Sequence, residues 1–327
     1  MQIPRPSAVG RPGSRARPLV AALLCVLALF GCTRHGLVLH DHPLVGHVID
    51  VDAAREVAPG EALARMAGSD AVLLGEVHDN PVHHRLQLKA LQAIAAQASP
   101  VLAMEQFDSE HQAAIDEAWR RPGVDAEMLA DAGQFAREGW GWPLYRPLVQ
   151  EAVQRRLPLV AINLSREGAR AVAREGFESM PAGAGREVVE EPWNPKMQAV
   201  LEELIRVGHC GEVSPRVLKM IVTAQRSRDA VMAERIAPHL DRGAVVVLGA
   251  GHARRDLAVP VYLARLAPGR RILSVGMVEV REDADAPHDY LAVREGLFDL
   301  VWFTPRNVRA DPCEGMSKAR MSKSMSK

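Results

Sequence analysis

The sequence predicts an α/β protein with a mainly parallel central sheet flanked by helices, and with helical insertions forming a subdomain. Short apolar or β-rich runs recur along the chain, and long amphipathic segments separate them, which is the pattern of successive βα units. The chain has 327 residues, of which 48% are hydrophobic, and this is enough to bury a sizeable core.

Seven runs are predicted as strands. Five are clear, and they span residues 70–76, 100–106, 157–163, 243–251 and 271–280. Two further runs, 44–50 and 299–305, are expected as edge strands. Between the first two clear runs, Asn80 is expected to cap a helix that has Pro81 at its first position.

These elements are expected to form one domain over residues 43–306, with helical insertions near 108–157 and 165–240. Residues 33–42 are predicted to be a linker. The Lys-rich end, 307–327, is predicted to be a disordered tail, because its Met-Ser-Lys repeats show no apolar periodicity.

The first 32 residues have the pattern of an export signal and are excluded from the fold. Four arginines precede the apolar run "LVAALLCVLALFGC", which is shorter than a typical membrane-spanning helix. It ends in Leu29-Phe30-Gly31-Cys32, which resembles the lipobox of bacterial lipoproteins, where the cysteine is lipidated. An ordinary secretory peptide and an uncleaved anchor are the alternatives. With Thr33 rather than Asp after the cysteine, the expected location is the cell envelope, lipid-anchored to the outer membrane and facing the periplasm.

Charge and cysteine content narrow the expectations further. The 40 Lys and Arg balance the 40 Asp and Glu, so no long-range attraction to phosphate exists and a nucleic-acid partner is not expected. Apart from Cys25 in the signal and Cys32, the chain has Cys210 and Cys313. An exported protein can join such a pair in a disulfide, but Cys313 lies beside the tail, and the sequence leaves the pairing open.

Four predicted strands end in polar residues. Beyond the carboxyl ends of parallel strands, loops converge and ligands bind. The first clear strand ends in Glu76 and His78, the second in Glu105, the third in Asn163, and the fourth leads to His252. We therefore expect these five residues to form one rim, although a turn or helix-cap role is the alternative for each of them alone.

Two chemistries suit Glu76, His78, Glu105 and His252. Two carboxylates and two imidazoles can bind a divalent metal ion such as zinc or manganese, or they can act in acid–base catalysis. The sequence has no HExxH zinc helix, so a metal would depend on strands converging and not on local spacing.

His83 and His84 follow on the helix that Asn80 starts. Adjacent helical residues point about 100° apart, so they cannot both face the rim. Either one of them touches a ligand, or both belong to a solvated first turn.

Aromatic residues make up 4% of the chain, yet "FAREGWGWPLY" contains Phe135, Trp140, Trp142 and Tyr145. The segment is either a loop pinned into the core by its tryptophans, or a flat apolar wall for a planar ligand or a second subunit. In the second case Tyr145 is notable, because a phenolate can be an axial ligand of ferric haem.

Five blocks of the sequence resemble the ChaN family of iron-regulated, haem-binding lipoproteins. They are "LLGEVHDNPVHHRLQ", "VLAMEQFDSEHQ", "WGWPLYRPLVQEAVQRRLPLVAINLSRE", "AQRSRDAVMAERI" and "VVVLGAGHARRDLAVPVYL". They occur in the family's order and span residues 43–280, and the lipobox-like Cys32 agrees with them.

The resemblance implies a haem-binding lipoprotein that takes part in haem or iron uptake or handling at the cell envelope. It also implies a homodimer that holds haem as a cofacial pair with tyrosine ligation, and by position Tyr145 is the iron ligand, ahead of Tyr262 and Tyr290. The residues expected to contact haem are Tyr145, Glu76, His78, His83, His84, Trp142, Asn163 and His252.

The wider superfamily implies an alternative. Erythromycin esterases and Tiki/TraB proteases share a similar Gly-Glu-x-His, here Gly75 to His78, and a Gly-x-x-His, here Gly249 to His252. In those relatives the motifs look catalytic. The chain would then be a metal-dependent hydrolase that uses Glu76, His78, Glu105 and His252, but a retained rim does not establish turnover, and haem binding is the preferred interpretation.

Overall fold

The computed structural model describes residues 36–191, 193–311 and 313–314. The predicted export signal, with Cys32, and residues 315–327 of the predicted tail lie outside these ranges. Within the described part, no helix is long and apolar enough to cross a membrane.

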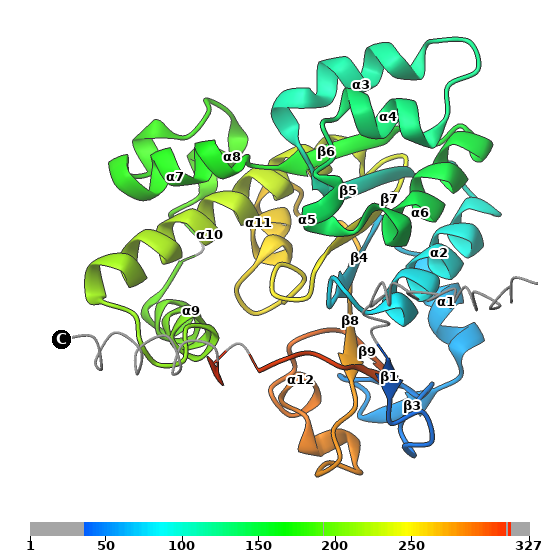
Figure 1. Cartoon of the computed structure of the whole chain (residues 1–327), viewed down its shortest axis with the longest axis vertical. Helices are drawn as coiled ribbons and strands as arrows, with labels where there is room; N and C mark the ends of the chain where they lie inside the picture. Colours follow the sequence, from blue (N-terminus) through cyan, green and yellow to red (C-terminus); the bar gives the residue numbers. More distant parts are fainter. Residues whose placement is uncertain (1–35, 192, 312, 315–327) are drawn as a thin grey trace, which may run out of the picture. The chain divides into compact units, whose positions relative to one another are not determined.

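An eight-stranded sheet lies at the centre of the described chain, in the order β3-β2-β9-β8-β4-β7-β5-β6 (Figure 1). The five clear runs form strands β4 (Ala71–Glu76), β5 (Val101–Asp108), β6 (Leu159–Asn163), β7 (Ala244–Gly249) and β8 (Ile272–Glu279). Within the group formed by these strands and β9 (Leu300–Thr304), every hydrogen-bonded pair of strands is parallel. This confirms the predicted mainly parallel sheet.

The prediction of two edge strands is wrong. β2 (Val48–Asp50) and β9 both lie inside the sheet, because β3 (Arg55–Val57) pairs antiparallel with β2 and takes the edge position. β3 is three residues long and begins with two exposed charged side chains, so it has no apolar pattern to detect. A separate two-stranded sheet joins β1 (Leu37–Val38), within the predicted linker, to β10 (Arg306–Asn307), at the start of the predicted tail.

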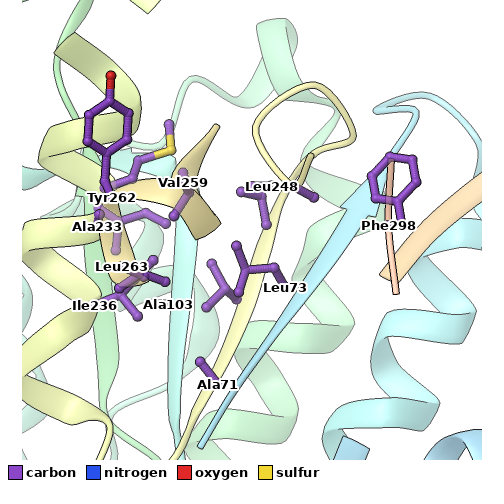
Figure 2. Packing of buried hydrophobic residues seen from close by; sticks show 14 of the residues in the cluster. Ala71, Leu73, Ala103, Ala233, Ile236, Leu248, Val259, Tyr262, Leu263 and Phe298 are labelled. Atoms are coloured by element: carbon purple, nitrogen blue, oxygen red, sulfur yellow. The ribbon is translucent and has the colours of Figure 1, made fainter. Parts of the chain in front are cut away.

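Alternate residues of the central strands point to opposite faces of the sheet, and each face carries its own apolar core. One core covers Leu73, Val246 and their neighbours with helices α7 (Arg166–Glu175), α10 (Pro215–Ile236) and α11 (Val259–Leu266). Figure 2 shows Tyr262 of α11 in this core, close to Ala233 and Val259.

The core on the opposite face contains Leu74 and Val247. It is covered by α1 (Pro59–Ala67), α2 (Pro81–Ala95), α3 (Gln112–Trp119), α4 (Ala126–Ala132) and α6 (Trp142–Arg155). Helix α2 begins as predicted, because the side chain of Asn80 accepts a hydrogen bond from the Val82 amide at 2.9 Å and Pro81 is the first helical residue. With helices on both faces, the ends of the strands are where a site can form.

The remaining helices are short, apart from α9. They are α5 (Arg137–Trp140), α8 (Ala184–Val188), α9 (Pro195–Gly208) and α12 (Leu291–Arg294), with single 3₁₀ turns η1 (Ser109–His111), η2 (Phe177–Ser179), η3 (Ala237–His239) and η4 (Pro287–Asp289). The two stretches predicted as helical insertions contain η1 with α3 to α6, and α7 to α10. Helix α9 packs against the start of α10 in a third, smaller apolar cluster.

A disulfide joins Cys210 to Cys313, which resolves the pairing that the sequence left open. The two cysteines are 103 residues apart in sequence. The bond fastens the described end of the chain to the turn that follows α9.

Candidate functional site

Four of the five rim residues lie together where strands β4, β5 and β7 end. Glu76 of β4 is in register with Gly249 of β7, and the Gly249 amide donates a 2.6 Å hydrogen bond to Oε2 of Glu105 on β5. His78 follows β4, and His252 follows β7. The prediction that these strand ends meet at one edge of the sheet is therefore confirmed for Glu76, His78, Glu105 and His252.

The carboxylate of Glu76 is the centre of a buried hydrogen-bond network. Its Oε1 accepts from the Tyr145 hydroxyl, from Nδ1 of His78 at 2.9 Å and from Nε2 of Gln106 at 3.3 Å. Its Oε2 accepts from Nε2 of Gln87 at 2.6 Å. A buried carboxylate needs such donors, so the network fixes the Glu76 side chain in one position.

Tyr145 is fully buried on α6, and its hydroxyl donates to Glu76. Burial, and next the negative charge of Glu76, raise the pKa of the Tyr145 phenol well above its ordinary value. The rings of His84 and Phe135 lie 4.5 and 5.8 Å from that of Tyr145, centre to centre. Tyr145 is thus a neutral phenol whose hydroxyl points towards Glu76.

The other aromatic residues of this segment divide between two roles. Phe135 and Trp142 are buried in the core, which is the first of the two alternatives that the sequence left open. Trp140 is only partly buried, and its ring meets that of His78 edge-on at 4.9 Å.

His78 is the most exposed residue of the rim, with 44% of its side chain accessible. Burial alone would lower its pKa, but the hydrogen bond to Glu76 and the charges of Glu105 and Glu76 outweigh that effect and the pKa is raised. A Cβ at Gly249 would lie 3.0 Å from Cε1 of His78, so a larger residue there would displace the His78 ring.

His252 lies between two carboxylates. Its Nδ1 is 2.6 Å from Oδ1 of Asp229, and its Nε2 is 3.6 Å from Oε1 of Glu105. Burial opposes the charged imidazole, but Asp229 and Glu105 prevail and raise its pKa to about 9. The ring is therefore charged near neutral pH, with one nitrogen facing Asp229 and the other facing Glu105.

Asp229 is a member of this site that the sequence reasoning missed. It lies near the middle of α10 and is 3% exposed. The only signal for it was an acidic residue on the apolar face of a long helix. The packing of α10 against β6 and α11 is what brings Asp229 to His252.

His83 and His84 are both buried, so the alternative of a solvated first turn is wrong. His84 faces the rim: its Nε2 donates to the His78 carbonyl at 2.9 Å, and its Nδ1 lies 3.3 Å from Oε2 of Glu76. His83 faces away, accepting from the Val77 amide at 2.9 Å, and burial lowers its pKa to about 3. The two rings point to different partners, as adjacent helical positions require.

Asn163 lies apart from the other rim residues. Its Nδ2 donates to Oδ1 of Asp108 at 3.2 Å, on the β6 side of β5. Within the described chain, no hydrogen bond joins it to Glu76, His78, Glu105 or His252. The expectation that it shares their site has no support from these contacts.

The rim does not have the geometry of a metal centre. Among residues 36–311 that are described, a group of three His, Cys, Asp or Glu ligand atoms within 4.8 Å of one another occurs at Asp108, Glu110 and His111, and not at the rim.

A cavity of about 440 Å³ opens beside His252, between α9 and α10; we call it the α9–α10 cavity. Its wall is mainly apolar, and it includes Leu201, Leu204, Ile205, Ile221, Leu257 and Phe298 together with His209, Asp229, His252 and Arg254. A neighbouring cavity of about 550 Å³, between α9 and α12, shares Leu204 and Arg254 with it. Cavities of this size hold small organic ligands.

A larger cavity, of about 600 Å³, lies next to Leu159, at the start of β6, and His239. It is at the amino end of the strand, away from the rim, and for that reason we do not associate it with the site.

His209 ends α9 and contributes an imidazole to the α9–α10 cavity. Its Nδ1 donates to the Ile205 carbonyl at 2.7 Å, which places the proton on Nδ1 and leaves the lone pair on Nε2. Nε2 of His209 has no hydrogen-bond partner in the part of the chain that the structure describes. The sequence reasoning did not single out this residue, because a lone histidine after a helix has no distinguishing pattern.

The chain was compared with known proteins. A family model described as "Haem-binding uptake, Tiki superfamily, ChaN" matches residues 62–263. Among solved structures, ChaN of Campylobacter jejuni, described with cofacial heme binding, superposes with a TM-score of 0.65 at 18% identity, over 78% of this chain and 95% of that one. This likeness confirms the fold.

A second solved structure, the type III effector HopBA1, matches with a TM-score of 0.40 at 12% identity, over 75% of this chain and 92% of that one. A similarity at that level carries no argument. No curated protein matches the chain at a significant level.

Proposed function

Because this chain belongs to the family of haem-binding uptake proteins of the Tiki superfamily, ChaN, we propose that it binds haem. The family match over residues 62–263 is the observation that carries the proposal, and the matching fold of a ChaN described with cofacial heme binding supports it.

The α9–α10 cavity is the place that suits haem best. Haem, when bound, supplies a flat apolar ring, two carboxylates and an iron ion with open coordination positions. Leu201, Ile205 and Leu257 provide an apolar wall, and Arg254 provides a cation close to it, although its guanidinium already pairs with Asp256 at 2.7 and 2.9 Å. Lys196, in the adjoining α9–α12 cavity, provides a second cation for a carboxylate.

The tyrosine ligation that the family resemblance implies would require a buried tyrosine to become accessible to haem. All three tyrosines of the chain are buried: Tyr145 and Tyr262 are 0% exposed, and Tyr290 is 3% exposed. Tyr145 also uses its hydroxyl for Glu76, and it would have to give up this hydrogen bond to bind iron. As the protein is folded here, Tyr145 serves to hold Glu76 in place.

We propose His209 as the iron ligand instead. Its Nε2 lone pair is directed by the hydrogen bond from Nδ1 to Ile205, which is the arrangement that orients metal-binding histidines in general. His252 suits this role less well, because its Nδ1 lies 2.6 Å from Asp229 and its Nε2 lies 3.6 Å from Glu105.

An absorbance titration of the purified full chain with haemin tests both proposals. We expect a saturable Soret band, a changed or weakened band in His209→Ala, and an unchanged one in Tyr145→Phe. His288→Ala is the matched control, because His288 is a highly exposed histidine outside the cavity. If Tyr145→Phe removes the band and His209→Ala keeps it, the iron ligand is Tyr145; if the wild-type chain gives no saturable band, the haem proposal itself fails.

We also propose that two chains form a dimer that holds two haems. Leu204, Val207 and Leu291 are large apolar side chains that are 42%, 66% and 56% exposed, and all three line the α9–α12 cavity. Light scattering with and without haemin is expected to show a shift to dimer in the wild type and in Val308→Asp, but not in Val207→Asp. Val308 is the control because it is 48% exposed and does not line either cavity.

The location at the cell envelope and the lipid anchor at Cys32 are proposals that rest on the sequence alone. Metabolic labelling with a fatty acid in a bacterial host tests them. We expect label on the wild type and on Cys25→Ser, and none on Cys32→Ser. Label that persists in Cys32→Ser would exclude Cys32 as the lipid site.

One observation favours a second function, hydrolysis of an ester or peptide bond: His252 lies between Asp229 and Glu105 at the rim where His78 is exposed. Turnover of ester and peptide substrates by the wild type that Glu105→Gln abolishes would establish it, and no turnover above background would remove it.

A further inference from the structure

The turn that follows α9 is tied to the end of the described chain by the Cys210–Cys313 disulfide. Cys210 comes directly after His209, the residue that caps α9 and lines the α9–α10 cavity. Neither cysteine is fully buried, so the core does not shield the bond from a thiol in solution. The disulfide is therefore next to the cavity and accessible to a reductant.

The Cys313 side of the bond is fixed to the body of the protein. The side chain of Asn307 donates to the Asp79 carbonyl at 2.8 Å, and the Arg309 guanidinium pairs with the carboxylates of Asp79 and Glu279. Cys313 is four residues beyond Arg309, and four residues of chain span at most about 14 Å. The disulfide thus attaches the end of α9 to a fixed point through a short segment.

Apart from the disulfide, α9 is held to the body by apolar packing. Met197, Leu201 and Ile205 form its buried stripe, which packs against the start of α10 and the residues just before α11. In the described chain, the side-chain hydrogen bonds and ion pairs of α9 and its caps stay within residues 193–209. Neither α10 nor the sheet holds α9 by a polar side-chain contact in that part of the chain.

These contacts give α9 a low local stability. It has 14 residues, and an isolated helix of this length is marginal in water. In the turn that follows, Cys210 and Gly211 have φ angles of 58° and 77°. A residue with a β-carbon disfavours this left-handed conformation, so a restraint on Cys210 helps to keep the turn closed. The disulfide supplies that restraint.

Helix α9 is a wall of both neighbouring cavities. Ile205 and His209 line the α9–α10 cavity, Val200 and Val207 line the α9–α12 cavity, and Leu204 lines both. The facing helix α10 is anchored in the main core by its second half. A shift of α9 therefore changes the width of both cavities and leaves the sheet in place.

We propose that the Cys210–Cys313 disulfide is a redox latch that holds α9, and with it His209, against the α9–α10 cavity. A dithiol cleaves the bond: it gives two electrons and two protons, the disulfide becomes two thiols, and the dithiol is oxidised to a disulfide. After cleavage α9 keeps only its apolar packing and opens more often, so a ligand in the cavity is held less tightly. The part that concerns haem rests on the function proposed above, whereas the release of α9 does not.

Hydrogen–deuterium exchange of the full chain, read by mass spectrometry, tests the latch without any ligand. Dithiothreitol is expected to speed amide exchange in α9 and the following turn by about tenfold or more, and in α2 much less, because the opening is local. The double variant Cys210→Ser with Cys313→Ser is expected to exchange at the faster rate with or without dithiothreitol. Cys25→Ser is the matched control, because it removes a cysteine outside the pair, and it is expected to respond as the wild type does.

A haemin titration tests the consequence for the cavity. The double variant is titrated without a reductant, so that no reagent changes the oxidation state of the iron. Its affinity is expected to be lower than that of the wild type and of Cys25→Ser by about tenfold or more, because only the closed fraction of the protein binds.

The latch is wrong if α9 exchanges equally fast before and after dithiothreitol treatment. An equal rise in α2 and α9 would also contradict it, because it would mean a loss of global stability instead of a local opening. Faster exchange in α9 with an unchanged haemin affinity would exclude control of the cavity by the disulfide. A wild type that binds no haemin would overturn the haem proposal, and the exchange result would still decide whether the latch exists.

Discussion

At the scale of single residues, His252 owes its charge to side chains from different parts of the fold. Asp229 from α10 and Glu105 from β5 stabilise the imidazolium, while Arg228 and desolvation oppose it. His78, the other rim histidine, is coupled to the same carboxylate, Glu105. The rim thus pairs two histidines with buried acids, and both have a raised pKa.

The raised pKa of His252 makes stability depend on pH. Its pKa is about 9 in the folded protein against an ordinary 6.5, so the stabilisation is fully present below pH 6.5 and is lost as pH rises towards 9. Between pH 6.5 and 9 the unfolding free energy of His252→Gln is expected to fall less than that of the wild type, and the difference is on the order of 2 kcal/mol. Urea denaturation at several pH values measures it.

His78→Gln is the control for that experiment, because His78 also has a raised pKa but is far more exposed than His252. A smaller effect than that of His252→Gln is expected there. An equal slope for the wild type and His252→Gln between pH 6.5 and 9 would mean that His252 is not charged in the folded protein.

Tyr145→Phe tests whether the phenol holds Glu76. The variant keeps the ring and removes one donor from a buried carboxylate, so the unfolding free energy is expected to fall by about 1–3 kcal/mol. Tyr262→Phe is the matched control, because its hydroxyl is equally buried, donates to the Val189 carbonyl at a long 3.4 Å and has no buried carboxylate as acceptor. Equal losses in the two variants, measured by chemical denaturation, would contradict the role given to Tyr145.

Sequence reasoning reached part of this site. Glu76, His78, Glu105 and His252 were predictable because each follows an apolar run, and parallel strands bring such positions to one edge. Asp229, within α10, and His209, directly after α9, were not predictable, because the position of these helices depends on packing across long sequence separations. For Tyr145, the segment was recognised but the direction of the hydroxyl was not, since that depends on Glu76.

At the scale of elements, Asn80 fastens the start of α2 to the carboxyl ends of neighbouring strands. Asn80 caps the helix through its oxygen, and its nitrogen donates to Oε1 of Glu279 at 2.6 Å and to the Pro305 carbonyl at 2.9 Å. The Asn80 side chain therefore connects β8 and the residue after β9 to the first turn of α2, which carries His83 and His84.

Asn80→Ala is expected to lower the unfolding free energy by about 2–4 kcal/mol, because it removes a cap and two buried hydrogen bonds. Asn194→Ala, at the start of α9, is the control: it removes a cap that accepts from the Lys196 and Met197 amides and is expected to cost about 1 kcal/mol. Thermal and urea denaturation measure both. Equal costs would mean that the contacts to Glu279 and Pro305 contribute little.

Helix α2, with its capping Asn80 and initial Pro81, was predictable from sequence because capping is a local signal. The position of β2 inside the sheet was not, since it depends on β3, whose three residues carry no recognisable pattern.

At the scale of the whole molecule, the Cys210–Cys313 disulfide connects the end of the described chain with the α9 side of the α9–α10 cavity. Residues 103 apart in sequence are cross-linked, so the bond removes much of the freedom of the unfolded chain. Cys210→Ser with Cys313→Ser is expected to lower the unfolding free energy by about 2–4 kcal/mol. Denaturation of the wild type with and without a reductant measures the same quantity, and no effect of the reductant would contradict it.

The fold as a whole was largely predictable, because strand runs and βα alternation determine a parallel sheet with helices on both faces. The disulfide and the α9–α10 cavity were not, because both depend on how α9 lies against α10 and the loop after β7.

We propose that the chain binds haem in the α9–α10 cavity through His209. A crystal structure of the full chain grown with haemin tests it most directly. We expect a porphyrin against Leu204, Ile205 and Leu257, with Nε2 of His209 bonded to the iron. A haem whose iron is bound by Tyr145, or a haem held outside this cavity, would contradict it.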